Sequence, residues 1–179
     1  FKEANYIKEL STPNKIKGIN INIPKSRDYI INFVRSLTSK SKNIPPNLRK
    51  KFNANLEVNY EFGRCEYKAK IWQNGDWKDH LETLSRKNIT VHSSIAIKVI
   101  DDNYEGMTRF KILLPRTRYG NDHLFWNGML NYYNYTTLKM RIIRVDMNNV
   151  SYFGFIEELP TKEFLESNLE REGPKLEFD

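Results

Sequence analysis

Paired segments in which apolar and polar residues alternate are the strongest constraint on the fold of this chain. In the first pair, Ala54 to Tyr60 and Cys65 to Ile71 alternate on either side of a Gly63-Arg64 turn. Alternation with a period of two is typical of half-buried strands, and a short turn between two such runs predicts a β-hairpin. Two further pairs repeat this pattern: residues 95–99 with 110–114, and residues 138–145 with 152–156. Adjacent hairpins predict an antiparallel sheet.

Helical spacing of apolar residues interrupts these strands. It predicts helices over about 26–38, 121–135 and 160–169. Ile19 to Ile23 alternates and predicts a short strand before the first helix, whereas residues 76–92 fit neither pattern. We therefore expect an α+β domain, an antiparallel sheet with the helix 121–135 inserted against it.

Charge is distributed unevenly along the 179 residues. The chain carries a net charge of +7, but residues 157–179 hold eight acids against three bases, a net of −5, so the rest carries +12. The basic residues are spread out rather than clustered with aromatic residues, which disfavours nucleic-acid binding. The single Cys65 excludes an internal disulfide and a cysteine-based zinc site. No apolar run reaches the about 18 residues of a transmembrane helix.

Two polar segments are candidates for chemistry. Asp76, Asp79 and His80 fall within five residues and could hold a cation. A polar turn with Trp77 tucked beneath it explains the same spacing, and we favour the turn. Lys111 lies in a strand just before the helix that begins near Asp122. A strand lysine paired with an acid on the following helix holds phosphates in some phosphoryl-transfer folds, but a half-exposed strand explains the same alternation.

Several motifs follow one another between residues 50 and 179. In chain order they are Gly75-Asp-Trp-Lys-Asp-His80, Ser94-Ile-Ala-Ile-Lys98, Gly106-Met-Thr-Arg-Phe-Lys111, Pro115-Arg-Thr-Arg118, Asn148-Asn149 with Gly154-Phe155 and Glu157-Glu158, Leu165-Glu-Ser-Asn168, and Glu170-Arg-Glu-Gly-Pro174. This ordered set resembles the CotH family of kinase-like spore-coat and surface proteins. It is most similar to a bacterial subgroup with a Gly-Asp-Trp-x-Asp-His segment. Residues 15–50 carry the resemblance faintly.

The resemblance implies an architecture. Residues 51–179 would form the small lobe of a protein-kinase-like fold with the start of a larger lobe, and residues 1–50 an amino-terminal strand and helix extension with a linker. Backbone N–H groups at the Gly75 turn would cover the phosphates of ATP, and Lys111 would contact them. Asp122 would orient Lys111, and Glu158 would belong to the hinge that meets adenine.

The resemblance also implies what this chain lacks. The family's metal-binding and catalytic aspartates lie in the larger lobe, so we expect them beyond Asp179 and assign no catalytic residue and no metal ligand here. We interpret the chain as a piece of a longer protein. The complete protein would use ATP with Mg²⁺ to phosphorylate Ser or Thr of a surface or coat protein, which favours a location at the cell surface.

A second class of function fits some departures from the family pattern. The helix 121–135 contains no Glu, so a Lys–Glu pair cannot form with it. The strand before Gly75 reads Lys70-Ile-Trp-Gln-Asn74 where the subgroup has Arg/Lys-Leu-Lys, so it has lost basic character. These departures favour a non-catalytic cell-surface or coat assembly module that keeps the fold without the chemistry. A basic nucleic-acid-binding domain is the third and weakest alternative.

Overall fold

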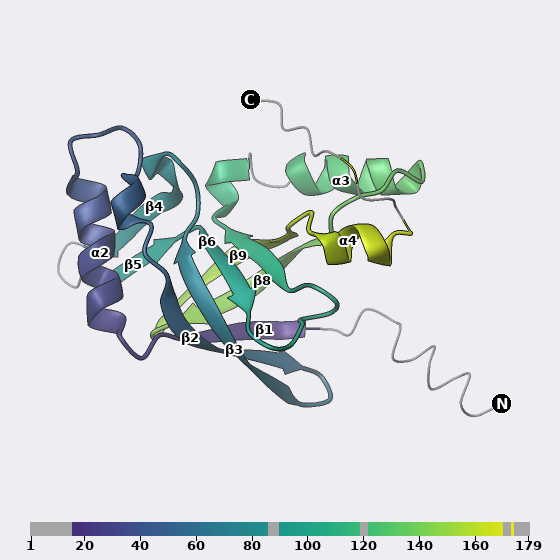
Figure 1. Ribbon diagram of the computed structural model, residues 1–179, viewed down its shortest axis with the longest axis horizontal. Helices are drawn as coiled ribbons and strands as arrows, with labels where there is room; N and C mark the ends of the chain where they lie inside the picture. Colours follow the sequence, from purple (N-terminus) through teal and green to yellow (C-terminus); the bar gives the residue numbers. More distant parts are fainter. Residues whose placement is uncertain (1–15, 86–89, 119–121, 170–172, 174–179) are drawn as a thin grey trace.

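Seven strands close into a barrel in the computed structural model, which describes residues 16–85, 90–118, 122–169 and 173. The strands follow one another around the barrel in the order β1, β2, β3, β6, β7, β9, β8. Their bounds are Ile16–Asn22 for β1, Phe52–Tyr60 for β2, Arg64–Gln73 for β3, Ile95–Val99 for β6, Arg109–Leu113 for β7, Met140–Met147 for β8 and Val150–Glu158 for β9. The barrel is the body of the molecule (Figure 1).

The closed barrel corrects the predicted fold class. The prediction of an open antiparallel sheet with an inserted helix, like a kinase small lobe, is wrong because β1 joins both ends of the sheet. It pairs antiparallel with β2 and parallel with β8, where Ile19 lies beside Val145 and Ile21 beside Met147. A parallel pair between segments so far apart in the chain has no connecting turn, so no local sequence signal announces it.

The three predicted hairpin pairings are confirmed. β2 pairs with β3, β6 with β7, and β8 with β9, all antiparallel. Asn148 and Asn149 form the β8–β9 turn with φ of 46° and 69°, a left-handed backbone that asparagine tolerates better than most residues. The predicted alternation therefore placed the strands correctly, although it did not show how the hairpins join.

Side chains at every second position of each strand fill the barrel interior. The fully buried residues include Ile19, Leu56, Ile71, Phe110 and Val145. β-Branched and aromatic side chains of this kind pack well between pleated strands. Their burial from water is the main favourable contribution to folding, at about 25 cal/mol for each Å² of apolar surface.

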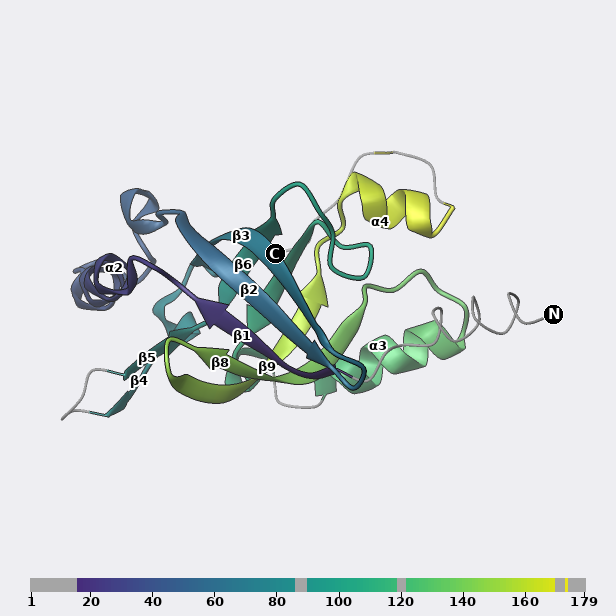
Figure 2. The same cartoon turned by 90° about the horizontal axis from the view of Figure 1, so that it is seen from below.

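The two ends of the barrel carry different elements (Figures 1 and 2). At one end lie α2 (Ser26–Thr38), which buries Tyr29 and Phe33, and the small sheet of β4 (Leu81–Ser85) with β5 (Thr90–Ser93). At the other end lie α3 (Asp122–Tyr132) and α4 (Lys162–Ser167). Three short 3₁₀ helices complete the described chain: η1 (Pro46–Leu48), η2 (Lys78–His80) and η3 (Pro115–Arg118).

The three predicted helices are present, but α3 is not placed as expected. None of its residues is buried, so it does not cover the sheet. The reason lies in its sequence, since its apolar and polar side chains are only weakly separated into two faces. α2 and α4, by contrast, each bury at least one large aromatic residue.

Candidate functional site

An open pocket of about 400 Å³ lies where β3 ends and the Gly75 turn begins. Its walls come from the residue that follows η1, the end of β3, the turn itself, η2 with the residue before it, and β7. The lining residues are Arg49, Trp72, Gln73, Asn74, Gly75, Asp76, Trp77, His80 and Lys111. Two predicted site residues, Gly75 and Lys111, therefore line one pocket, together with the cationic Arg49, which sequence reasoning did not select.

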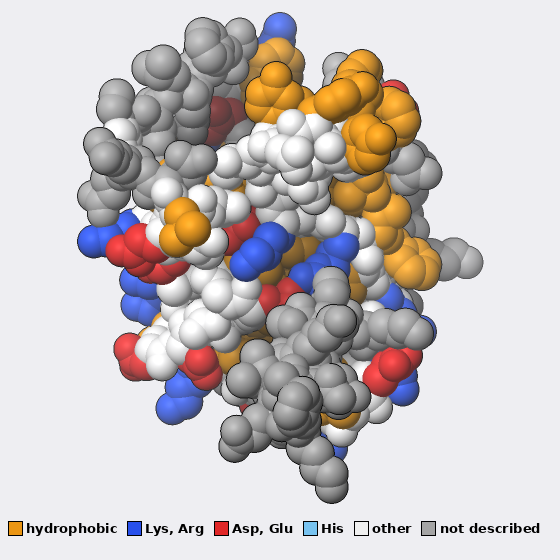
Figure 3. Space-filling model, turned by 90° about the vertical axis from the view of Figure 1, so that its right-hand side faces the viewer, with side chains coloured by type: hydrophobic (Ala, Val, Ile, Leu, Met, Phe, Trp, Pro, Cys, Tyr) orange, Lys and Arg blue, Asp and Glu red, His pale blue; other side chains and the backbone are white. Residues whose placement is uncertain are grey.

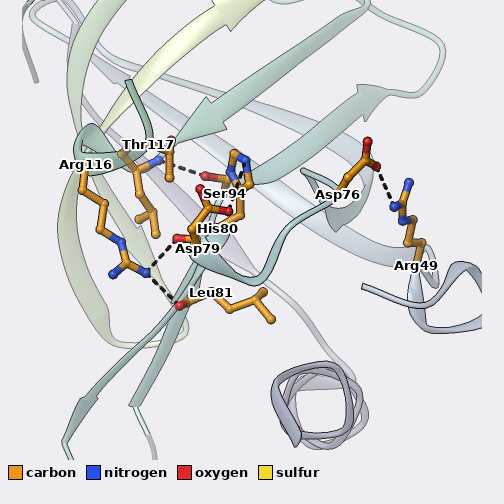
Figure 4. A network of polar contacts seen from close by, with 9 residues as sticks. Arg49, Asp76, Asp79, His80, Leu81, Ser94, Arg116 and Thr117 are labelled. Carbon is orange, nitrogen blue, oxygen red and sulfur yellow. Dashed lines mark hydrogen bonds and ion pairs between the residues drawn. The ribbon is translucent and has the colours of Figure 1, made fainter. Parts of the chain in front are cut away.

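Gly75 is required by the shape of the turn. Its φ is +95°, a conformation that L residues rarely adopt, and an added Cβ would overlap the ring of His80. His80 ends η2 and lies against the turn in Figure 4. The first and last residues of the Gly-Asp-Trp-x-Asp-His motif are thus packed against each other, so the motif specifies a local structure.

Asp76 ties the turn to the segment that follows α2. Its carboxylate lies 2.6 Å from the Arg49 guanidinium, and its carbonyl accepts a 2.7 Å hydrogen bond from the Ile44 N–H. Trp77, which we expected beneath the turn, is instead 65% exposed. Among the described residues no group of three or more potential metal-ligating side chains occurs. The turn is therefore present, but the expected position of Trp77 beneath it is wrong.

Arg116 holds the other end of the same segment. Its guanidinium donates hydrogen bonds of 2.8 Å to the carbonyls of Asp79 and Leu81 (Figure 4). Nearby, the buried Ser94 hydroxyl accepts the Leu114 N–H at 3.1 Å. The Ser94 N–H also donates to the His80 carbonyl at 2.9 Å. Residues of the Ser94 and Pro115 motifs therefore fix residues 79–81 to the barrel.

Lys111 has an acidic partner that sequence reasoning did not pair with it. Its ammonium lies 3.6 Å from Oε1 of Glu157, which is opposite it in the β7–β9 ladder. The other oxygen of Glu157 lies 3.3 Å from Nε2 of His123 in α3. Glu157 is only 6% exposed. Lys111 and Glu157 meet because of the register of β7 against β9. These two strands are not joined by a hairpin turn, so the sequence does not reveal this register.

The remaining two predicted site residues do not line the pocket. Asp122 is the exposed first residue of α3, and within the described part of the chain no ion pair joins it to Lys111. Glu158 is buried and accepts the Lys139 N–H at 3.1 Å, while its own N–H donates to the Lys139 carbonyl. Burial raises the pKa of Glu158, and the Lys139 N–H and ammonium partly oppose this shift. The Glu158 N–H is therefore already used within the barrel.

Comparisons with known proteins do not assign this chain to a family. No protein-family model matches the chain, and a search of curated proteins finds no match. In the described residues no helix is long and apolar enough to cross a membrane. Of the segments that carry the resemblance, Glu170 to Pro174 lies outside the described residues apart from Gly173, as does Asp179.

Proposed function

We propose that this chain binds the phosphates of ATP at the Gly75 pocket and is the nucleotide-binding part of a CotH-type atypical protein kinase. The complete protein would phosphorylate Ser or Thr of a surface or coat protein. The observation that carries the proposal is the presence of Lys111 and Arg49 in one pocket with the Gly75 turn.

The two cations suit a phosphate ligand. Charge-assisted hydrogen bonds from Lys and Arg to phosphate oxygens are stronger than neutral ones, and Arg can bind two oxygens at once. Arg49 is held by the exposed Asp76 carboxylate, and Lys111 by the buried Glu157. Both side chains are therefore oriented before a ligand arrives, which lowers the entropy lost on binding.

Two tryptophans offer a surface for the base of a nucleotide. Trp72 and Trp77 line the same pocket, and Trp77 is largely exposed. The Lys51 ammonium also lies over the Trp72 ring, 5.1 Å from the ring centre. An indole face stacks readily on a planar base, and such stacking contributes about 1–3 kcal/mol for each base.

The residues of the pocket fit the phosphates of ATP better than they fit a resident metal. Among the described residues that line the pocket, Asp76 is the only one with a carboxylate, and it is paired with Arg49. Mg²⁺ in nucleotide sites is held by phosphate oxygens, water and one or two carboxylates. ATP supplies the phosphoryl group when it is bound. The residues of this chain would bind and orient its phosphates.

The alternative proposal is a non-catalytic assembly module. It rests on the structural roles of the motif residues, since Gly75 packs on His80, Asp76 pairs with Arg49, and Lys78 donates to the carbonyl at the end of α2. A motif explained by local structure needs no ligand. The two proposals differ in whether the pocket binds nucleotide at all.

Calorimetric titration of the chain with ATP, with and without Mg²⁺, separates them. We expect Lys111→Met to weaken ATP binding about tenfold or more, because one charge-assisted contact is lost. Lys98→Met is the matched control, since Lys98 is an exposed lysine on the neighbouring strand β6 and does not line the pocket. Equal affinities of the two variants, or no ATP binding by the folded wild type, would contradict the nucleotide proposal and favour the assembly module.

A further inference from the structure

The outer face of the barrel carries a row of cations on three neighbouring strands. Lys70 of β3 lies opposite Lys98 of β6, and Lys98 lies opposite Arg109 of β7. Lys68 adds a further cation two residues before Lys70 on β3. Residues two apart on a strand point to the same side of the sheet, and all of these cations are exposed. We call Lys68, Lys70, Lys98 and Arg109 the basic face.

The register of the sheet creates this cluster. Lys70, Lys98 and Arg109 are far apart in the sequence, where the basic residues are spread out and disfavour nucleic-acid binding. In the barrel the three strands are neighbours, and neighbouring strands lie about 4.8 Å apart, so the three residues stand side by side. Like charges directly opposite one another destabilise a sheet. A row that costs folding stability in this way is explained if it binds an anion.

The cations of the basic face are not neutralised by ion pairs. Among the described residues, no ion pair joins any of them to a carboxylate. Acids stand at the border of the face: Glu66 on β3, and Asp101, Asp102 and Glu163, which line an open pocket together with Lys98 and Arg109. The cations therefore remain available to a negatively charged ligand, while the acids confine that ligand to the centre of the face.

A tryptophan and two amides lie directly beside the cations. Trp72 follows Lys70 by two residues on β3 and is partly exposed, so its ring shares the face. On β2, Asn53 pairs with Lys70 and Asn55 pairs with Lys68. Both asparagines are exposed, and a side-chain amide offers donors as well as an acceptor. The face therefore combines positive charge with an aromatic surface and with neutral hydrogen-bonding groups.

We infer that the basic face binds single-stranded nucleic acid. Its cations would contact phosphates, Trp72 would stack on one base, and the two asparagine amides would pair with base edges. Proteins that bind single strands combine a positive surface, which follows the backbone, with aromatic side chains on which bases stack. Single-stranded RNA and single-stranded DNA both supply this chemistry, and the inference does not depend on the proposed ATP site.

Other polyanions match this face less well. A duplex keeps its bases inside the stack, where Trp72 cannot reach their faces. A sulfated glycan supplies negative charge but no planar base. A membrane surface would call for apolar side chains among the cations. Exposed apolar side chains gather instead at the end of the barrel that carries α3 (Figure 3), and they include Phe125, Trp126 and Leu130.

Fluorescence anisotropy with labelled oligo(U) and oligo(dT) of about 12 nucleotides tests the inference. We expect a Kd of about 1–100 µM at physiological salt for at least one of them, and the tighter ligand is the one that the face selects. Lys70→Gln combined with Lys98→Gln should weaken binding about tenfold or more. It should also make the slope of log affinity against log salt shallower by about 1.4, which is about 0.7 for each lost phosphate contact.

The matched control is Lys25→Gln combined with Lys40→Gln. It removes the same charge from two exposed lysines that flank α2, away from the basic face, and it should leave affinity nearly unchanged. The melting temperature is a second readout. The Lys70 and Lys98 variant should not melt at a lower temperature than the wild type, because it relieves the repulsion between opposite lysines. Weaker binding together with a lower melting temperature would assign these lysines a structural role.

Trp72→Ala tests which polyanion the face selects. It should weaken oligonucleotide binding about tenfold, because one stacked base loses its platform, and leave the binding of a heparin hexasaccharide unchanged. An unchanged oligonucleotide affinity would overturn the inference in favour of a general polyanion surface. No binding of either oligonucleotide up to about 1 mM protein, or equal weakening by the control variant, would also overturn it.

The basic face and the Gly75 pocket can be tested separately. Neither Lys70 nor Lys98 lines that pocket, so the variant that lacks both lysines should bind ATP as the wild type does. A wild type that binds oligonucleotide but no ATP would contradict the proposed function alone. A wild type that binds ATP but no oligonucleotide would contradict this inference alone.

Discussion

Glu157 is a buried carboxylate that lies between Lys111 and His123. Glu157→Gln keeps the shape and removes the charge, which leaves the Lys111 ammonium without its acidic partner. We expect the free energy of unfolding to fall by about 1–3 kcal/mol, as when a buried charge-assisted contact is lost. Urea denaturation measures this change. Glu66→Gln, at an exposed position of β3, is the control and should change stability by less than about 0.5 kcal/mol.

Glu158 makes folding stability depend on pH. Burial raises its pKa above the ordinary value of 4.5, so the folded chain holds this proton more tightly than the unfolded chain. The stability gained from the protonated form is therefore complete below pH 4.5 and is lost as the pH rises through the folded-state pKa. Glu158→Gln stays neutral, and its carbonyl can still accept the Lys139 N–H.

The prediction is that the wild type loses stability relative to Glu158→Gln as the pH rises above 4.5. Urea denaturation of both proteins at several pH values measures the difference, and other titrating groups cancel in the comparison. A wild type that gains stability relative to the variant over this range would contradict the raised pKa.

Individual residues were predictable where one local pattern decides their role. The resemblance placed Gly75 in a turn, and its positive φ is a backbone conformation that favours glycine. Lys111 was selected from its place in a strand, and the structure puts it in the same pocket. Its partner Glu157 was not paired with it, because that pair depends on the β7–β9 register. Arg49 and His123 lie in segments that only the folded chain brings to their partners.

At the scale of elements, Lys78 links the Gly75 segment to α2. Its ammonium donates to the Leu37 carbonyl at 3.0 Å and to the Ser39 carbonyl. The last carbonyls of a helix have no partner within the helix, and a cation there also opposes the negative end of the helix dipole. Lys78→Met should therefore lower the free energy of unfolding by about 1 kcal/mol.

Thermal and urea unfolding measure this effect. Lys68→Met is the control, because Lys68 is an exposed lysine in the middle of β3, and it should leave stability nearly unchanged. Equal stabilities of the two variants would show that the contact of Lys78 with α2 contributes nothing.

Elements were predictable where periodicity is strong, and their placement was not. The alternation in β2, β3 and β9 and the apolar spacing in α2 predicted each element near its observed bounds. The sequence pattern predicted that α3 is a helix, but it did not predict where α3 packs, because packing depends on tertiary contacts. Residues 76–92 fit no period because they contain η2 and the two short strands β4 and β5.

At the scale of the whole molecule, closure by β1 decides the fold. The resemblance to a kinase-like family led us to expect an open lobe, whereas the observed strand order returns to its start through the β1–β8 pair. Closure removes both free sheet edges, which would otherwise expose unpaired N–H and C=O groups. Most barrel strands pair with a neighbour through a predicted hairpin, so β1 is the element on which closure depends.

The closure predicts that β1 contributes to global stability as a core strand does. Ile19 is fully buried and lies beside Val145 of β8. Ile19→Ala should lower the free energy of unfolding by about 2–5 kcal/mol, because it removes buried methyl groups and leaves a cavity. Ile142→Ala is the matched control, since Ile142 lies in β8 but is 47% exposed, and it should cost less than about 1 kcal/mol. Similar small losses for both variants in urea denaturation would mean that β1 is peripheral, and the seven-stranded barrel would then be wrong in solution.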